Sequence, residues 1–222
     1  MSTAVILFDK KSNIMKHAFI SMAALWCFFA CQTSRDADSE LLEMDLPAAR
    51  EGISYRTSSQ WSGAQVLHWD TDAAGNAMAF NVSSEQLAPY RYLVCELYHE
   101  EEYSLRVGFN FFDKDAGNSG VSWQSGERLS GADMHPRLAV RIGALPLLKT
   151  NIVFPLSHLD GQEIFLRRFP GQLKGTASGH RIPLDKVVAF SISVDPFTET
   201  QFVPNVQIKR VYFSKDPPPA LP

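Results

Sequence analysis

Three tryptophans lie beside predicted turns, and their surroundings make them candidates for binding a sugar. Trp61, Trp69 and Trp123 occur in the segments SSQWSG, LHWDTD and GVSWQSG. A flat indole ring offers an apolar face for the C–H face of a sugar ring and fixes few torsions in doing so. Trp69 falls on a predicted strand and is expected in the core, and plain packing is the alternative for the other two. The predicted carbohydrate-binding residues are Trp123, which we expect to be the most exposed, with Trp61, Gln124 and Asn118.

Motifs of common hydrolases and phosphate-binding enzymes are missing from the sequence. The segment from His99 to Tyr103 begins like the zinc motif HExxH, but Tyr103 stands where the second histidine is required. There is no GxSxG nucleophile turn and no GxxxxGK phosphate loop. Glu96 and Glu100–Glu102 offer carboxylates for glycoside hydrolysis, but a solvated strand end explains them better. No catalytic residue is predicted, and whether the chain is an enzyme stays open.

One acidic segment has the residue types of a calcium loop. Asp113, Asp115 and Asn118 place oxygen-bearing side chains around Gly117, and hard cations take several such oxygens. Gln124 occupies the position where a calcium loop requires an acidic residue that binds the ion through both carboxylate oxygens. We therefore predict a hairpin loop, no metal ligands and no cofactor, with a structural calcium ion elsewhere in the domain left open.

The segment Met15–Cys31 has the pattern of a secretory signal. A short basic start precedes an apolar run that is shorter than the roughly 20 residues a membrane-spanning helix needs. Ala30 comes directly before Cys31, and a cysteine at this point indicates lipid attachment, as in bacterial lipoproteins. We expect a lipoprotein of the outer membrane or cell surface, whereas ordinary cleavage would give a periplasmic or secreted protein. Met15 is an alternative start to Met1.

Composition argues against nucleic acid as a partner and leaves one cysteine after the signal. The 21 Lys and Arg against 24 Asp and Glu give a net charge of −3, and no basic run follows the signal. Nucleic acid requires a dense basic patch to neutralise its phosphates. Cys27 lies in the signal and Cys31 at its end, so Cys95 is left, in the apolar segment YLVCELY, and it has a disulfide partner only if Cys31 carries no lipid. We expect its thiol to be buried and unreactive.

The chain from residue 54 onward follows the period of two that is typical of strands. Between Leu105 and Phe111 the alternation places Val107 and Phe109 in the core and Arg106 outside it. The predicted strands are Gln65–Trp69, Ala77–Val82, Tyr92–Tyr98, Ser104–Phe112, Arg137–Gly143, Thr150–Pro155, Val187–Val194 and Val206–Phe213. Eight strands without an amphipathic helix predict an all-β fold, an antiparallel two-sheet jelly-roll sandwich of the galactose-binding-like type.

The predicted organisation has four parts. Residues 1–31 form the signal with a leader extension, 32–53 a polar tether, 54–214 the β-sandwich, and 215–222 a Pro-rich tail. The tail, DPPPALP, cannot join a central strand and has the composition of a linker that leads to another domain.

The segment from Asn151 to Val194 resembles a known family module. Its features are a strand ending in Pro-Leu, then Leu-Asp-Gly, an irregular loop, and Ile-Pro-Leu-Asp-Lys-Val leading into a strand, with VQIKRVYF closing the domain. This pattern is similar to the sandwich module that precedes the catalytic barrel in agarases and related bacterial polysaccharide hydrolases. The resemblance extends over residues 54–214. It implies a carbohydrate-binding-like β-sandwich, and it carries over no catalytic carboxylate because the sequence stops where the barrel would begin.

Three functions are compatible with these observations. The favoured interpretation is a non-catalytic module of a surface-anchored or secreted protein that binds polysaccharide, for which the resemblance implies an agar-type galactan. The second is a remnant or subunit of an agarase-type glycoside hydrolase. The third is a structural domain that docks a partner protein.

Overall fold

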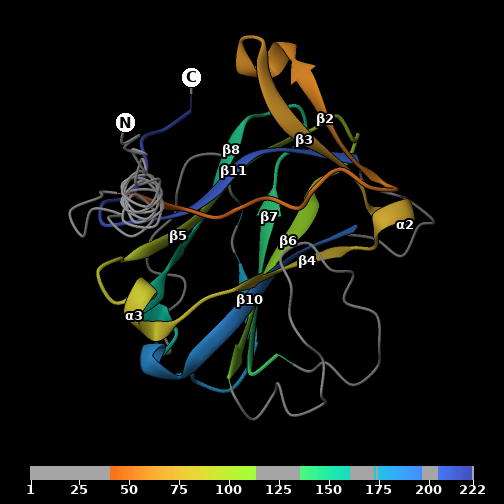
Figure 1. The fold of residues 1–222 in the computed structure, drawn as a ribbon. Helices are drawn as coiled ribbons and strands as arrows, with labels where there is room; N and C mark the ends of the chain where they lie inside the picture. The colour runs from red at the N-terminus through yellow and green to blue at the C-terminus, as the bar shows by residue number, and fades with distance from the viewer. Residues whose placement is uncertain (1–40, 114–135, 161–172, 174, 197–204, 222) are drawn as a thin grey trace, which may run out of the picture. The chain divides into compact units, whose positions relative to one another are not determined.

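The computed structural model describes residues 41–113, 136–160, 173, 175–196 and 205–221, which form two antiparallel sheets. Sheet A has the order β2-β3-β11-β5-β8, with β1 also paired to β11, and sheet B has the order β4-β10-β6-β7-β9 (Figure 1). The strands of sheet A are β1 (Leu41–Glu43), β2 (Ile53–Ser58), β3 (Ala64–Asp70), β5 (Tyr92–His99), β8 (Thr150–Pro155) and β11 (Asn205–Ser214). Those of sheet B are β4 (Ala77–Asn81), β6 (Leu105–Asp113), β7 (Leu138–Ala144), β9 (Thr176–Gly179) and β10 (Val187–Pro196).

Helix in the described residues is confined to single turns between strands. These turns are η1 (Ser59–Trp61), α2 (Thr71–Ala74), α3 (Ser84–Leu87), η3 (Leu156–His158) and η4 (Leu184–Lys186). The turn α3 has a complete capping box, in which Ser83 and Gln86 each satisfy the other's backbone N–H. The turn η4 leads directly into β10. No described helix has the length and apolarity needed to cross a membrane.

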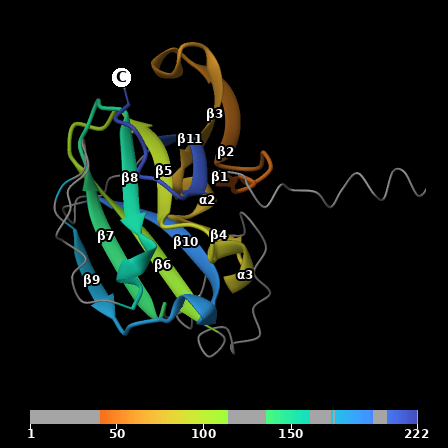
Figure 2. The ribbon, with the colours of Figure 1, turned by 90° about the vertical axis from the view of Figure 1, so that its left-hand side faces the viewer.

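The two sheets pack face to face over one hydrophobic core, so the predicted all-β sandwich is confirmed. Figure 2 shows β7, β6 and β10 side by side in sheet B. From sheet B, Phe111 meets Phe154 of sheet A with ring centroids 4.9 Å apart, and Phe190 meets Phe213 at 5.5 Å. Successive residues of a strand point to opposite faces, so one face of each sheet lines this core and the other lies outside it. We call these the inner and outer faces.

All eight predicted strands are present, as β3 to β8, β10 and β11. Val107 and Phe109 are fully buried and Arg106 is exposed, as the alternation indicated. Trp69 lies in the core and donates a hydrogen bond from Nε1 to the Gly75 carbonyl oxygen at 2.9 Å. The predicted burial of Val107, Phe109 and Trp69 is therefore confirmed.

Cys95 is fully buried in β5 and makes no disulfide. Burial raises the pKa of its thiol far above the ordinary value, and the neighbouring Glu96 carboxylate adds to the shift. The prediction of an unreactive side chain is consistent with this environment, because the thiolate is the nucleophilic form.

Three strands, β1, β2 and β9, were not predicted, and β1 corrects the expected tether. Residues 41–43 belong to the segment 32–53, yet they pair antiparallel with β11. Leu42 packs on the main core and Leu41 on the outer face of sheet A, while Glu43 forms an ion pair with Arg210 at 3.3 Å. Burial of the two leucines outweighs the acidic composition of this segment. The residues of β9, TASG, are all exposed and carry no apolar alternation that a sequence pattern can detect.

Candidate functional site

The outer face of sheet B carries a connected set of polar side chains from neighbouring strands. Asn110 of β6 lies opposite Ser191 of β10, and Gly108 lies opposite both Ser193 of β10 and Arg141 of β7. These positions alternate with core residues, so their side chains point away from the core. Asn110, Ser191 and Ser193 are nevertheless at most 6% exposed. Buried polar groups need hydrogen-bond partners, and here they find them in one another.

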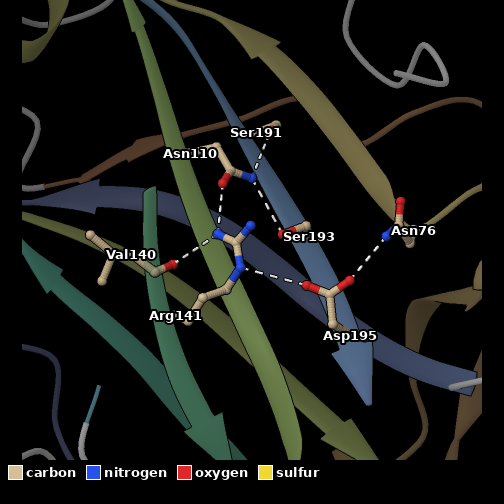
Figure 3. A network of polar contacts seen from close by, with 7 residues as sticks. All are labelled: Asn76, Asn110, Val140, Arg141, Ser191, Ser193 and Asp195. Carbon is tan, nitrogen blue, oxygen red and sulfur yellow. Dashed lines mark hydrogen bonds and ion pairs between the residues drawn. The ribbon is translucent and has the colours of Figure 1, made fainter. Parts of the chain in front are cut away.

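Arg141 is the centre of this network (Figure 3). Its Nη1 donates to Asn110 Oδ1 at 2.7 Å and to the Val140 carbonyl oxygen at 3.3 Å. Its Nε lies 3.5 Å from Asp195 Oδ2. From β7, the rigid guanidinium fork therefore reaches across β6 and joins an amide on β6 to a carboxylate on β10.

The amides of the network fix the other polar groups. Asn110 Nδ2 donates to Ser191 Oγ at 3.0 Å and to Ser193 Oγ at 3.3 Å. Asn76 Nδ2 donates to Asp195 Oδ1 at 3.0 Å, so both oxygens of this carboxylate are engaged. Side chains that are held by several partners need little reorganisation to contact a ligand, and their orientation is already set.

Gly108 makes the path of Arg141 across β6 sterically feasible. A Cβ atom built on Gly108 would lie 2.6 Å from Arg141 Nη1 and 2.3 Å from Ser193 Oγ. Both distances are far below van der Waals contact. The requirement for glycine here comes from this close approach of side chains, and its backbone conformation needs no positive φ.

Part of the network is open to solvent. The side chains of Arg141 and Asp195 are 31% and 30% exposed, and Arg106 beside them is exposed. Burial lowers the pKa of the Arg141 guanidinium, the Asp195 carboxylate opposes this shift, and the Arg106 charge adds to it.

This arrangement is suited to binding and lacks the groups for hydrolysis. Glycoside hydrolysis requires two carboxyl groups on opposite sides of the bond to be broken. Among the seven residues of the network in Figure 3, Asp195 alone has a carboxylate. What the network offers is guanidinium and amide N–H donors beside carboxylate and amide oxygens, the groups that hydrogen-bond hydroxyls.

The acidic cluster noted in the sequence does not form an acid pair in the structure. Glu96 is 1% exposed, and its Oε1 accepts hydrogen bonds from Arg210 Nε at 2.8 Å and pairs with Arg210 Nη2 at 2.7 Å. Glu101 Oε1 instead accepts from the backbone N–H of Asn205 at 2.9 Å. These carboxylates have structural partners. No group of three or more metal-ligating side chains is found among the described residues.

Of the four predicted carbohydrate-binding residues, the structure describes Trp61. Trp123, Gln124 and Asn118 lie outside the described residues, as does the predicted lipidation site Cys31. Trp61 ends the turn η1 but is only 7% exposed, packed against Val66 and Tyr98 on the outer face of sheet A. Its role in binding stays a prediction. It lies on the other sheet from the Arg141 network, so the two are separate features.

Sequence reasoning missed every member of the network. Arg141 interrupts the apolar segment LAVRIGA and Asn110 interrupts FNFF, and both are buried or half-buried. The signal that could have found them is a polar residue on one strand that lies opposite a glycine or a serine on the next strand, as Arg141 lies opposite Gly108 and Asn110 opposite Ser191. Strand pairing had to be known before that signal could be used.

A concave feature lies at the end of sheet A near α3. It is a cavity of about 500 Å³ lined by two half-buried tyrosines, Tyr90 and Tyr92, together with Arg91, Leu184 and other residues. The Tyr90 ring is 6.4 Å from that of Phe213 in the core. This cavity has the size of a small-ligand site, but it lacks the connected hydrogen-bond network seen on sheet B.

The chain is similar to parts of larger solved structures. No family model matches the chain, and no curated protein matches it. Among solved structures it is similar to an exo-beta-agarase, at 11% identity and a TM-score of 0.46, and to PfGH50B, at 12% identity and a TM-score of 0.40. These alignments cover 81% and 79% of this chain but only 26% and 23% of those chains. The resemblance to an agarase module is confirmed, and at these TM-scores it carries no argument about activity.

Proposed function

We propose that this chain is a non-catalytic module that binds a polysaccharide, an agar-type galactan, on the outer face of sheet B. The observation that carries the proposal is the network around Arg141, in which a half-exposed guanidinium and carboxylate are held in fixed orientation. A sugar hydroxyl both donates and accepts, so it pairs with an Arg donor and an Asp acceptor at the same time. The galactan follows from the sequence resemblance.

Preorganisation is the physical reason for favouring this face. Binding costs free energy whenever flexible side chains must be ordered, by about 0.5–1.5 kcal/mol for each long side chain. Arg141 is already held by Asn110, Val140 and Asp195. Its contact with a ligand therefore carries little of that cost. Gly108 and Gly143 lie beside it on the same face, where Gly108 is covered by Arg141 and Ser193 and Gly143 by Leu173, so the exposed parts of Arg141 and Asp195 are the groups that a sugar would contact.

Affinity electrophoresis tests the proposal directly. The full chain is run in native gels with and without dissolved agarose, and the same measurement is made on Arg141→Lys. Lysine keeps the positive charge but lacks the planar guanidinium group with its several N–H donors. We therefore expect agarose to retard the wild type and to bind the variant roughly tenfold more weakly, the effect of losing one charge-assisted hydrogen bond. Arg56→Lys is the matched control, because Arg56 is an exposed arginine on β2 of the other sheet.

The outcomes separate the three interpretations. Equal retardation of Arg141→Lys and the wild type would exclude sheet B as the binding face. Release of reducing sugar from agarose by the wild type would make the chain an enzyme. A wild type that migrates unretarded in agarose and in other galactans would leave the docking domain as the remaining interpretation.

We also propose that the protein is exported and held at a membrane by lipid on Cys31. The support is the sequence pattern of residues 15–31. Cys31→Ser is expected to move the protein from the membrane fraction to the soluble fraction after cell lysis. A wild type found in the soluble fraction would refute the lipid anchor and leave export by ordinary cleavage.

A further inference from the structure

The chain after β11 folds back onto the outer face of sheet A. Ser214 Oγ donates to the Asp216 carbonyl oxygen at 2.8 Å, which turns the chain. Asn151 Nδ2 then donates to the Pro219 carbonyl oxygen at 2.7 Å. Leu221 packs against the cluster formed by Trp61 and its neighbours. We call residues 216–221 the strap.

An aromatic surface with flanking cations lies under the strap. Trp61 and Tyr98 pack together there. The ammonium group of Lys209 lies 5.3 Å from the centre of the Trp61 ring, and that of Lys149 lies 5.8 Å from it. Cations over an indole face are held by the ring quadrupole and do not need a fixed hydrogen-bond geometry. Lys209 also forms an ion pair with Glu96 Oε2 at 3.8 Å, whereas no ion pair of Lys149 is found among the described residues. Lys149 is thus the lysine that is able to turn toward another group without breaking an ion pair.

Two buried polar atoms at this place have no hydrogen-bond partner among the residues that the structure describes. They are Trp61 Nε1 and Asn151 Oδ1, in residues that are 7% and 6% exposed. Unpaired buried polar atoms are rare and each calls for an explanation, such as a missing ligand. These are the same two residues that the strap contacts. The strap covers them but satisfies neither atom.

The strap itself is held weakly. Its contacts in the described residues include two side-chain hydrogen bonds, from Ser214 to the Asp216 carbonyl oxygen and from Asn151 to that of Pro219, and the packing of half-buried Leu221. Pro217, Pro218 and Pro219 have no backbone N–H, so this stretch cannot add ladder hydrogen bonds to a sheet. A ligand that satisfies the two unpaired atoms has little to displace.

We propose that the outer face of sheet A is a second saccharide site that the strap occupies in the free protein and leaves when a galactan binds. One pyranose ring stacks on Trp61 after Leu221 moves away. Its hydroxyls accept from Trp61 Nε1 and donate to Asn151 Oδ1, which a single type of group can do because a hydroxyl is both donor and acceptor. Lys149 turns from the ring to a sugar oxygen, while Lys209 keeps its ion pair with Glu96. This inference rests on the proposed function, because it assumes the same class of ligand.

The test releases the strap by one substitution in the full chain. Leu221→Ser removes the contact with the Trp61 cluster, and Leu147→Ser is the matched control because Leu147 is 67% exposed outside the strap. We expect Leu221→Ser to bind agarose on the order of tenfold more tightly than the wild type, as for a site that is open about one-tenth of the time before release. Trp61→Leu, which keeps an apolar side chain, should abolish the gain in the Leu221→Ser background. Melting temperatures verify that each variant is folded.

Acrylamide quenching of tryptophan fluorescence gives a readout that needs no sugar. Quenching should rise in Leu221→Ser and fall back when Trp61→Leu is added, because Trp61 is the indole that the strap covers. Retardation of the wild type with no gain in Leu221→Ser would overturn the strap and leave the proposed function intact. Absence of retardation in both proteins would overturn the proposed function, and this inference with it. A gain that persists in Trp61→Leu would place the site elsewhere and refute the inference.

Discussion

Gly108 allows the network on sheet B to be tested by the addition of one methyl group. In Gly108→Ala the new Cβ would lie 2.6 Å from Arg141 Nη1 and 2.3 Å from Ser193 Oγ, so both side chains must move. Arg141 would lose its 2.7 Å hydrogen bond to Asn110, and a bond to a charged group is worth about 1.5–3 kcal/mol. Alanine within a strand is more stabilising than glycine by about 0.5–1 kcal/mol, which offsets part of this loss. We expect a net destabilisation of about 1–2 kcal/mol.

Denaturant unfolding in two backgrounds tests the reasoning. In the wild type, Gly108→Ala should lower the midpoint without a change in slope. In a background that carries Arg141→Ala and Ser193→Ala, the atoms that the methyl group meets are gone. The same substitution should then stabilise by about 0.5–1 kcal/mol. Equal destabilisation in both backgrounds would show that the cost lies in the backbone, and that Gly108 does not position Arg141. Agarose binding should weaken with Gly108→Ala in the wild type, since the fork is displaced.

Three further predictions concern the core, the pH dependence of stability and Trp123. Phe109→Ala should destabilise by about 3–5 kcal/mol because Phe109 is fully buried; Tyr103→Ala, at a residue that is 61% exposed, is the control, and equal losses in urea unfolding would contradict this assignment. Burial lowers the pKa of His99 below its ordinary value of 6.5, so the folded state binds fewer protons than the unfolded one. The contribution of neutral His99 to the free energy of unfolding is complete above about pH 6.5 and is lost as the pH falls through the lowered pKa. When the pH is lowered from about 7.5 to about 5, His99→Gln should therefore lose less stability than the wild type. Trp123→Ala should weaken galactan binding and leave the melting temperature nearly unchanged, whereas a large fall in melting temperature would make Trp123 a packing residue.

The alternation of apolar and polar residues was sufficient to predict most strands, because one face of each strand packs on the core and is apolar. The alternation around Phe109 predicted β6 with its inner and outer residues. It failed for β1, whose three residues are too few for a period, and for β9, which has no apolar side chain to bury against the core. In both cases pairing with a neighbouring strand, β11 for β1 and β7 for β9, determines the structure. Pairing in the folded sheet, and not the strand propensity of the local sequence, therefore accounts for β1 and β9.

The sequence by itself determined the all-β class, the position of most strands and the burial of Trp69 and Cys95. Each of these follows from which side chains leave water, a property that neighbours along the chain already encode. Only the tertiary structure brought Arg141, Asn110 and Asp195 together, because they come from three strands whose order is β10-β6-β7. Asn110 and Arg141 are 31 positions apart in the chain. Their contact depends on the register between strands, and a shift of one residue would turn these side chains into the core. Register is fixed by packing across the whole sandwich, which no local segment encodes.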